Sequence, residues 1–224
     1  MVVSGYRRVL PGQDWFHPCR CLTLVGSGRK MRSAVSDHRA ASAPLLVVSG
    51  PAGAGKTTVS RLLAVEFDRS VHLKTDDFMA SIVSGWVDPN APEAAAQHEA
   101  VGGALAVSAM GFAGDGYTTV VDGHLFPDGV TGLAAACATR GIACHYAVLS
   151  APLATCWARA RGREEGRWPL EEEPVATLHA RFAALDVDPR HVVDASGTPD
   201  EVRDAVLSAF RADRLLVGGA RRSP

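Results

Sequence analysis

Residues 50–58, with the sequence GPAGAGKTT, constrain the fold of this chain more than any other stretch. They have the spacing G-x-x-x-x-G-K-[ST] of a phosphate-binding loop, or P-loop, in which glycines let the backbone approach an anion closely. The apolar run 45–49 precedes the loop, and residues 57–67 follow it with apolar side chains at helical spacing. These patterns predict a strand, a glycine-rich loop and a helix in succession, which is the local structure that such a loop requires.

Each part of the loop has a chemical role toward a bound phosphate. Its backbone N–H groups form an anion nest, and the helix that begins near Lys56 adds its N-terminal partial positive charge. The Lys56 ammonium can reach the β- and γ-phosphates of a nucleotide, and the Thr57 hydroxyl can ligate Mg²⁺. A glycine-rich turn that binds nothing is the alternative. The residues expected to bind ATP and Mg²⁺ here are Gly50, Pro51, Ala52, Gly53, Ala54, Gly55, Lys56, Thr57 and Thr58.

Composition excludes several classes of protein. The 224 residues, 47% of them hydrophobic, suffice for one domain with a buried core. The formal net charge of −1 argues against a large nucleic-acid-binding surface. No apolar run is long enough to cross a membrane. The five cysteines include no C-x-x-C pair, so we interpret them as small buried or loop thiols, which suits a cytoplasmic location.

The two ends of the chain differ from its middle. Residues 1–43 hold seven basic and two acidic side chains, and proline, glycine and serine interrupt every candidate element. We interpret them as a disordered basic extension; an organelle transit peptide is the alternative, although the prolines oppose an amphipathic helix. Residues 44–212 form the expected folded domain that contains the P-loop, and residues 213–224 are expected to be a flexible tail.

Strand and helix patterns alternate along the middle of the chain. This alternation predicts an α/β fold with a parallel sheet and helices on both faces. In such a sheet, ligands bind at the carboxyl ends of the strands, so functional residues should directly follow them. Strand patterns occur at 45–49, 71–75, 118–121, 144–149 and 191–193, and helix patterns at 57–67, 91–110, 130–139, 153–163, 173–185 and 199–211.

Carboxylates follow the second and third predicted strands. Asp76 and Asp77 lie in the sequence KTDDF at 74–78, where a carboxylate could orient an acceptor hydroxyl and take its proton. Asp76 is the candidate base, and Asp77 is expected to hold a Mg²⁺-bound water or cap a helix; the alternative is that both are helix-capping carboxylates. Asp122, which ends the third strand, resembles a Walker B carboxylate that contacts Mg²⁺ or its water, with an ordinary Asp-Gly turn as the alternative. His124 is a candidate substrate contact, with an ordinary loop histidine as the alternative.

Basic residues follow the fourth predicted strand at a spacing of four. Arg159, Arg163 and Arg167 would share one face of a continuing helix, and arginines on a lid can neutralise a transferring phosphoryl group. A solvated basic face paired with nearby glutamates is the alternative. Between the second and third strands, Trp86 and Gln97 are candidate contacts of the acceptor substrate, since in this architecture that region covers the acceptor.

These motifs together resemble those of the small-molecule P-loop kinases. The GPAGAGKTT loop, the DDF element at 76–78, the VVDG run at 120–123 and the arginine-rich segment after the fourth strand carry the resemblance, which covers about 44–212. The DDF element is similar to that of uridine and nicotinamide riboside kinases, and the layout to that of chloramphenicol phosphotransferase, gluconate kinase and shikimate kinase. The resemblance implies a P-loop NTPase three-layer sandwich with a five-stranded parallel sheet in the order 2-3-1-4-5, and it implies Asp76 as the base.

The expected function is ATP- and Mg²⁺-dependent transfer of a phosphoryl group to a hydroxyl of a small molecule such as an antibiotic, nucleoside or sugar derivative. Lys56, Asp76, Arg159 and Arg163 are the expected catalytic residues. The acceptor is the expected partner, no membrane or nucleic acid is expected, and a homodimer is one assembly that we consider. The alternatives are a regulatory ATPase without a small-molecule acceptor, and a kinase of a sugar nucleotide or of a polynucleotide 5′-hydroxyl.

Overall fold

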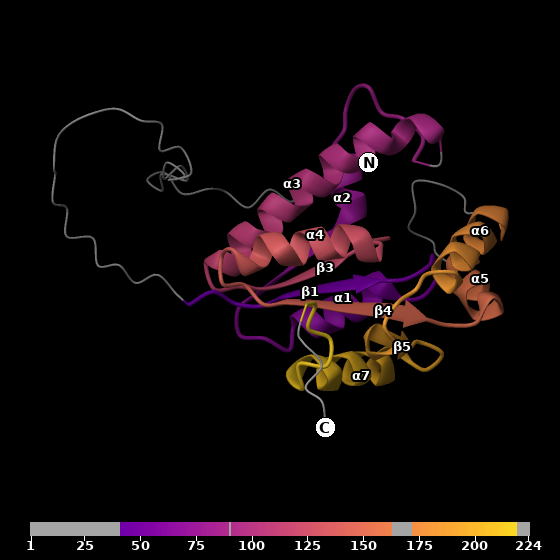
Figure 1. The fold of residues 1–224 in the computed structure, drawn as a ribbon. Coiled ribbons are helices and arrows are strands. Elements are labelled where there is room, and N and C mark those ends of the chain that lie inside the picture. Colours follow the sequence, from indigo (N-terminus) through magenta and orange to yellow (C-terminus); the bar gives the residue numbers. More distant parts are fainter. Residues whose placement is uncertain (1–40, 90, 163–171, 219–224) are drawn as a thin grey trace, which may run out of the picture. The chain divides into compact units, whose positions relative to one another are not determined.

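The computed structural model describes residues 41–89, 91–162 and 172–218. A sheet of five parallel strands in the order β2-β3-β1-β4-β5 forms its centre (Figure 1). The predicted α/β fold, strand order and parallel pairing are thereby confirmed. The strands are β1 (Leu45–Ser49), β2 (Ser70–Lys74), β3 (Thr118–Asp122), β4 (Cys144–Ser150) and β5 (Val192–Asp194).

Helices cover both faces of the sheet, which makes three layers (Figure 1). On one face α1 (Lys56–Ala64) packs against α7 (Pro199–Arg211), and on the other lie α3 (Ala95–Gly114) and α4 (Pro127–Ala138). The remaining helices are α2 (Thr75–Ala80), α5 (Leu153–Arg161), α6 (Glu172–Ala183) and the short 3₁₀ helices η1 (Pro92–Ala94) and η2 (Pro189–His191).

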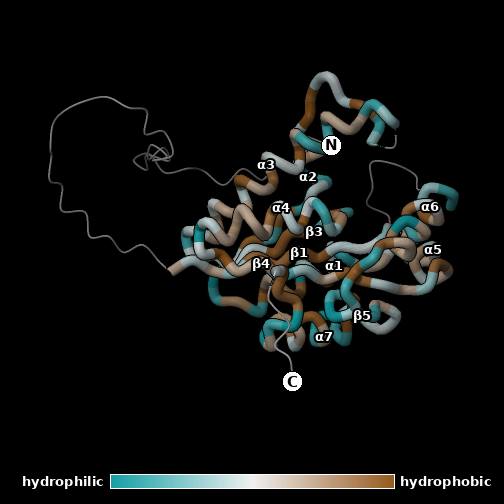
Figure 2. Tube along the Cα trace, viewed as in Figure 1, coloured by the Kyte–Doolittle hydropathy of each residue, from teal (hydrophilic) through white to brown (hydrophobic). Residues whose placement is uncertain are grey.

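The central strand β1 shows why the sequence forms this layered core. Its five residues are all buried, as expected for a parallel strand covered on both faces. Successive side chains point to opposite faces, so Leu46 and Val48 join the core beneath α1 and α7 while Leu45 and Val47 join the core beneath α3 and α4. Figure 2 shows the hydrophobic residues concentrated along the central strands. The apolar run before the P-loop therefore anchors the loop in both cores.

One helix was not expected from the sequence. The predicted second strand at 71–75 lies one residue too late, because β2 ends at Lys74 and Thr75 already begins α2. Asp76 and Asp77 consequently lie in the first turn of a helix, where their negative charges are favourable beside the exposed N–H groups. The α2 pattern is too short, at six residues, to give a clear helical period.

The described part of the expected tail packs against the sheet. Leu215 is fully buried, and its carbonyl oxygen accepts a hydrogen bond of 2.8 Å from the backbone N–H of Tyr146. Leu216 forms an antiparallel bridge with His145. Because β5 pairs only with the later residues of β4, the start of β4 has an open edge that this segment fills. The folded domain thus extends past residue 212, and residues 219–224 lie outside the described residues.

Two further expectations concern the rest of the chain. The expected extension at 1–43 lies, up to residue 40, outside the described residues. Among the described helices, none combines the length and the apolar character that crossing a membrane requires.

Candidate active site

The P-loop connects β1 to α1 and depends on glycine at two close approaches. Gly50 and Gly53 have φ of 138° and 78°, in the region that disfavours other residues. A Cβ at Gly50 would overlap the carbonyl oxygen of Leu149 on β4, and a Cβ at Gly53 would overlap that of Cys156 on α5. The loop backbone therefore lies directly against the end of β4 and the first turn of α5, which fixes its shape.

Replacement of Gly53 by alanine should be costly for a reason that a matched glycine lacks. Gly85 has a similar φ of 75° but open space around it, so Gly85→Ala should cost only the left-handed backbone penalty of about 1 kcal/mol. Gly53→Ala adds the overlap with Cys156, worth roughly a further 1–3 kcal/mol. Urea unfolding of both variants measures the difference, and equal losses of unfolding free energy would contradict this account of the loop.

Lys56 and the two threonines that follow it begin α1. Lys56 is only 7% exposed, and its Nζ donates a hydrogen bond of 2.9 Å to the carbonyl oxygen of Pro51, so the ammonium lies over the loop. Thr57 is half-buried and Thr58 is exposed in the same first turn. The loop amides, the helix N-terminus and this ammonium together form a positively polarised cradle for phosphate.

Asp122 ends β3, and its backbone pairs with Val48 of β1 directly before the loop. The residue is 3% exposed, and its Oδ2 accepts a hydrogen bond of 2.7 Å from Nε2 of His72 on β2. Its carbonyl oxygen accepts a second bond, of 2.9 Å, from the hydroxyl of Thr75. Sequence reasoning missed His72, because a histidine in the middle of a predicted strand carries no motif.

The loop after β3 is tied to the P-loop. Nδ1 of His124, a candidate substrate contact, donates a 2.9 Å hydrogen bond to the carbonyl oxygen of Gly50. The carbonyl oxygen of Leu125 accepts hydrogen bonds from the hydroxyls of Ser49, at 2.7 Å, and Tyr146, at 2.8 Å. Burial raises the pKa of Tyr146 to about 12, against the lowering effect of Ser49. These bonds hold the segment that bears His124 against the end of β1.

The two carboxylates after β2 have different surroundings. Asp77 forms an ion pair of 2.8 Å with Lys74 and is largely exposed. Asp76 is also exposed, and its carboxylate has no hydrogen bond or ion pair with another described residue. Of the two, Asp76 is therefore the one whose carboxylate is not engaged by a neighbouring cation.

The side chain of Gln97 holds a backbone segment of the same chain. Its side-chain amide makes two hydrogen bonds of 2.8 Å with the backbone of Val87, one to the N–H and one to the carbonyl group. Gln97 on α3 thereby fixes the segment after α2, which includes the partly exposed Trp86. Gln97, a candidate contact of the acceptor, thus holds the segment in which Trp86, the other candidate contact, lies.

Arg159 contacts the loop after β5. Its guanidinium donates hydrogen bonds to the carbonyl oxygens of Ala195, Ser196 and Gly197, at 2.7, 3.3 and 3.0 Å. Helix α5 ends at Arg161, before the predicted end at 163, and Arg163 and Arg167 lie outside the described residues. The three arginines are thus not brought together within the described structure, and Arg159 acts on a backbone loop.

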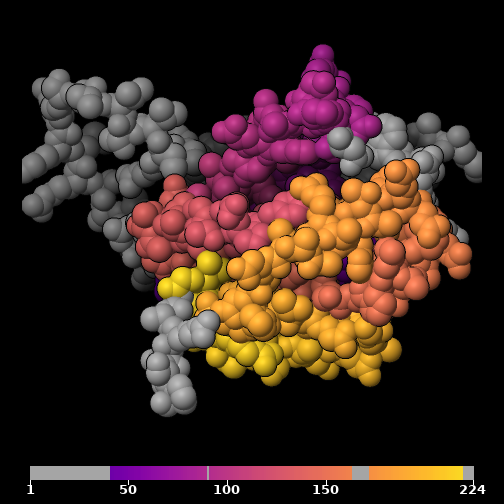
Figure 3. All heavy atoms as spheres, turned by 45° about the vertical axis from the view of Figure 1, so that its right-hand side comes forward, coloured from indigo at the N-terminus to yellow at the C-terminus, as the bar shows by residue number. Residues whose placement is uncertain are grey.

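A pocket of about 280 Å³ opens between the P-loop and the loop that Arg159 holds. Figure 3 shows the face of the molecule on which the orange α5–α6 region lies above the yellow α7 region. Residues of α5 and of the start of α7 line the pocket together with the P-loop. The residues that line the pocket are Gly53, Ala54, Gly55, Thr58, Val59, Arg159, Ala195, Gly197, Pro199 and Val202.

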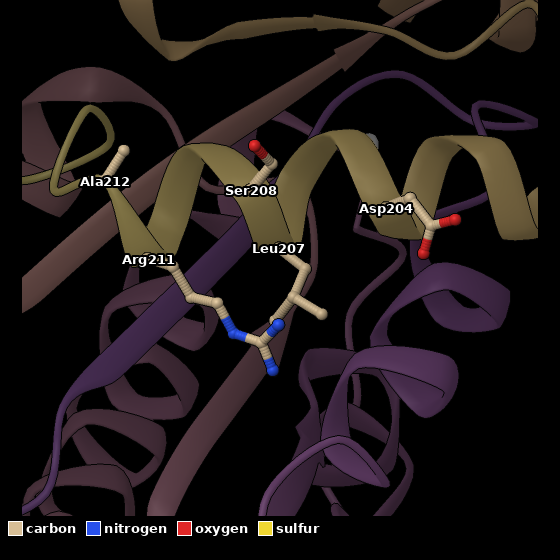
Figure 4. A pocket seen from close by; sticks show the side chains of 5 residues that line it. All are labelled: Asp204, Leu207, Ser208, Arg211 and Ala212. Carbon is tan, nitrogen blue, oxygen red and sulfur yellow. The ribbon is translucent and has the colours of Figure 1, made fainter.

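A second hollow, of about 500 Å³, lies along α7 and shares no residue with this pocket. Figure 4 shows that its five side chains all come from one helix and its C-terminal cap, with Leu207 and Arg211 on the same side. It contains no residue of the P-loop and none of the carboxylates that follow β2 and β3, so we assign the active site to the P-loop edge. Its lining residues are Asp204, Leu207, Ser208, Arg211 and Ala212.

The sheet order and the loop define the chain as a P-loop NTPase-like α/β protein. A family model described as an AAA domain matches residues 45–185, and the chain belongs to this family. No curated protein matches the chain.

Solved structures that resemble the chain include small-molecule kinases, as the sequence motifs predict. A sugar kinase from Janibacter sp. HTCC2649 is 20% identical, with a TM-score of 0.55 over 75% of this chain and 95% of that chain. A gluconokinase from Sinorhizobium meliloti 1021 is 17% identical, with a TM-score of 0.53 over 75% and 92%. The APS kinase from Mycobacterium tuberculosis, solved with AMPPNP and APS, is 17% identical, with a TM-score of 0.55 over 77% and 99%. At these identities the likeness shows a shared fold.

Proposed function

We propose that this protein is an ATP- and Mg²⁺-dependent phosphotransferase that moves the γ-phosphoryl group to a hydroxyl of a small molecule. The observation that carries the proposal is the position of three features at the ends of neighbouring strands: the P-loop after β1, Asp122 at the end of β3, and Asp76 in the first turn of α2, which follows β2. Because ligands of parallel sheets bind at the carboxyl ends of the strands, a phosphate on the loop and a hydroxyl near Asp76 would share one edge.

The P-loop is the proposed site of the ATP phosphates. The amides of residues 50–58 and the N-terminus of α1 favour an anion, and the Lys56 ammonium already lies over the loop. The adenine ring of ATP would occupy the 280 Å³ pocket, which is lined by P-loop residues on one side and by Arg159 and Ala195 on the other. In this assignment, Arg159 holds the backbone loop that forms one wall of the adenine pocket.

Arg159→Ala should weaken ATP binding because three backbone carbonyl groups of the pocket loop lose their donor. A hydrogen bond from a charged group is worth roughly 1.5–3 kcal/mol, so we expect a loss of about 10-fold in affinity after relaxation of the loop. Arg161→Ala is the matched control, since Arg161 is exposed two residues further along the same helix. Calorimetric titration with a non-hydrolysable ATP analogue measures both. An unchanged affinity of Arg159→Ala would contradict the pocket assignment.

Thr57 and Asp122 fit a Mg²⁺ site. They offer a hydroxyl and a carboxylate oxygen, which are the ligand types that Mg²⁺ prefers. Neither the Thr57 hydroxyl nor Oδ1 of Asp122 makes a hydrogen bond with another described residue. The described residues contain no group of three or more His, Cys, Asp and Glu side chains that could hold a metal ion. Mg²⁺ is usually bound by one or two carboxylates together with phosphate oxygens and water. When bound, the ion neutralises charge on the transferring phosphoryl group.

The proposed reaction is an in-line displacement at the γ-phosphorus. The acceptor oxygen forms a bond to phosphorus while the bond to the β–γ bridging oxygen breaks, and ADP leaves. Asp76 orients the hydroxyl and takes its proton, which later passes to solvent. Lys56 and the loop amides stabilise the charge that develops on the phosphoryl oxygens.

The acceptor would lie among Asp76, the segment that bears Trp86, and the loop that bears His124. Gln97 and the bonds on Leu125 give this region a fixed backbone. Sugar kinase and gluconokinase folds resemble this one, which supports a small hydroxylated acceptor such as a sugar derivative, nucleoside or antibiotic. Asp77, paired with Lys74, would support the position of α2.

A screen of ADP formation against hydroxylated metabolites, nucleosides and antibiotics tests the proposal. We expect one class of acceptor to raise ADP formation well above the rate with ATP alone. ATP hydrolysis that no small molecule stimulates, and that a protein partner does, would instead indicate a regulatory ATPase. Stimulation only by a polynucleotide 5′-hydroxyl or a sugar nucleotide would replace the small-molecule acceptor.

A further inference from the structure

The corner between β2 and α2 is bonded to the end of β3 at two points. The first bond joins Nε2 of His72 to Oδ2 of Asp122 at 2.7 Å. The second joins the hydroxyl of Thr75 to the carbonyl oxygen of Asp122 at 2.9 Å. The side chain and the backbone of Asp122 are therefore each held by a residue of the same corner, and we call this pair of bonds the Asp122 clamp.

Strand pairing explains how the clamp forms. Lys74 of β2 is the register partner of Asp122, and His72 precedes Lys74 by two residues. Since side chains two apart on a strand point to the same face, His72 lies on the face of the sheet that carries the Asp122 side chain. Gly123 completes the arrangement, because a Cβ there would overlap the Thr75 hydroxyl.

Burial makes the histidine bond energetically important. The Asp122 side chain is 4% exposed and the His72 side chain is 13% exposed. A buried carboxylate without a donor is strongly unfavourable, and the imidazole N–H is the only side-chain donor to this carboxylate among the described residues. The bond uses Oδ2, and Oδ1 has no hydrogen-bond partner in the described part of the chain.

We propose that His72 is a positioning residue for the Mg²⁺ site, an inference that rests on the proposed phosphotransferase function. By holding Oδ2, His72 fixes the orientation of the carboxylate and leaves Oδ1 to the metal ion or its water. Thr75 fixes the backbone of the same residue. Because Asp76 directly follows Thr75, the clamp also sets the distance between Asp122, the proposed Mg²⁺ ligand, and Asp76, the proposed base.

The test compares two substitutions of His72. His72→Leu removes the donor, whereas His72→Gln retains an N–H at a similar reach. The measurement is the ratio of the dissociation constants of a non-hydrolysable ATP analogue in EDTA and in Mg²⁺, by calorimetry. Loss of a group that orients a metal ligand typically costs 10–100-fold in metal affinity, so we expect His72→Leu to reduce this ratio roughly 10-fold. Binding in EDTA should stay within about 2-fold, since the P-loop is unchanged, and His72→Gln should recover most of the ratio.

Two results of the His72 variants would overturn the clamp proposal. One is a His72→Leu protein that keeps the wild-type ratio. The other is an equal fall in the ratio for both variants, accompanied by an equal fall in Tm, which would indicate a purely structural role. If His72→Leu does not fold, Thr75→Val removes the second bond of the clamp at nearly constant shape. Thr75→Val should also lower the ratio of the dissociation constants in EDTA and in Mg²⁺, and an unchanged ratio would overturn the proposal. A wild-type protein without any Mg²⁺ effect on nucleotide binding would instead contradict the proposed function.

Discussion

Lys56→Ala is expected to abolish most turnover and to weaken ATP binding as well. The ammonium is buried over the P-loop and is the one lysine among residues 50–58. Its hydrogen bonds to phosphate are charge-assisted, so their loss should weaken binding roughly 10- to 100-fold. The same group stabilises charge that develops during transfer, and its removal should lower kcat by about a further 10³-fold.

Arg61→Ala is the matched control for this variant. Arg61 is an exposed cation on the same helix, α1, but in its last turn. Calorimetry with an ATP analogue and a coupled assay of ADP formation should find it close to wild type. If Lys56→Ala retained wild-type nucleotide affinity, the phosphates would not bind where we propose.

Asp76→Asn is expected to separate binding from chemistry. Asp76 lies on α2 and is not part of the loop that holds the phosphates, so ATP affinity should stay within about 2-fold of wild type. An amide cannot accept the proton of the acceptor hydroxyl, and the loss of general base catalysis typically costs 10²–10⁴-fold, so we expect kcat to fall by about 10³-fold. The measurement is ATP affinity together with acceptor-dependent ADP formation.

Asp128→Asn provides the control for charge at a helix start. Asp128 is the second residue of α4, as Asp76 is the second residue of α2, and both are exposed. The control removes the same favourable helix-dipole interaction without removing the proposed base. Equal losses of ATP affinity and kcat in Asp76→Asn would count against its role as base, as would an equal effect of Asp128→Asn.

The parts of the fold that sequence could predict depend on local patterns. The limits of β1 and α7 agree with prediction, because an apolar run ends at the P-loop and because Pro199 follows a capping threonine. The Thr198 hydroxyl accepts a hydrogen bond from Glu201 N–H, and Glu201 in turn accepts one from the Thr198 N–H. Such signals lie within a few residues of the feature that they specify, so no tertiary information is needed.

The parts that sequence could not predict depend on contacts between distant segments. His72 and Asp122 are 50 residues apart, and only the neighbouring positions of β2 and β3 bring them together. Arg159 likewise donates hydrogen bonds to carbonyl groups 36–38 residues away. The spacing of four between the arginines predicts a shared face on a lid, whereas the contacts of Arg159 with the loop after β5 depend on the fold. Leu215 is buried because β4 has an open edge, a fact that no local pattern contains.

The most direct test of the central claim follows the γ-phosphate itself. ATP labelled at the γ-phosphorus is mixed with the wild-type protein, Mg²⁺ and the acceptor that stimulates ADP formation, and the products are separated after a single turnover. We predict that the label appears on the acceptor as a phosphate ester, in an amount equal to the ADP formed, and that Asp76→Asn transfers about 10³-fold more slowly. Label that appears only in inorganic phosphate, at equal rates with and without the acceptor, would contradict the account.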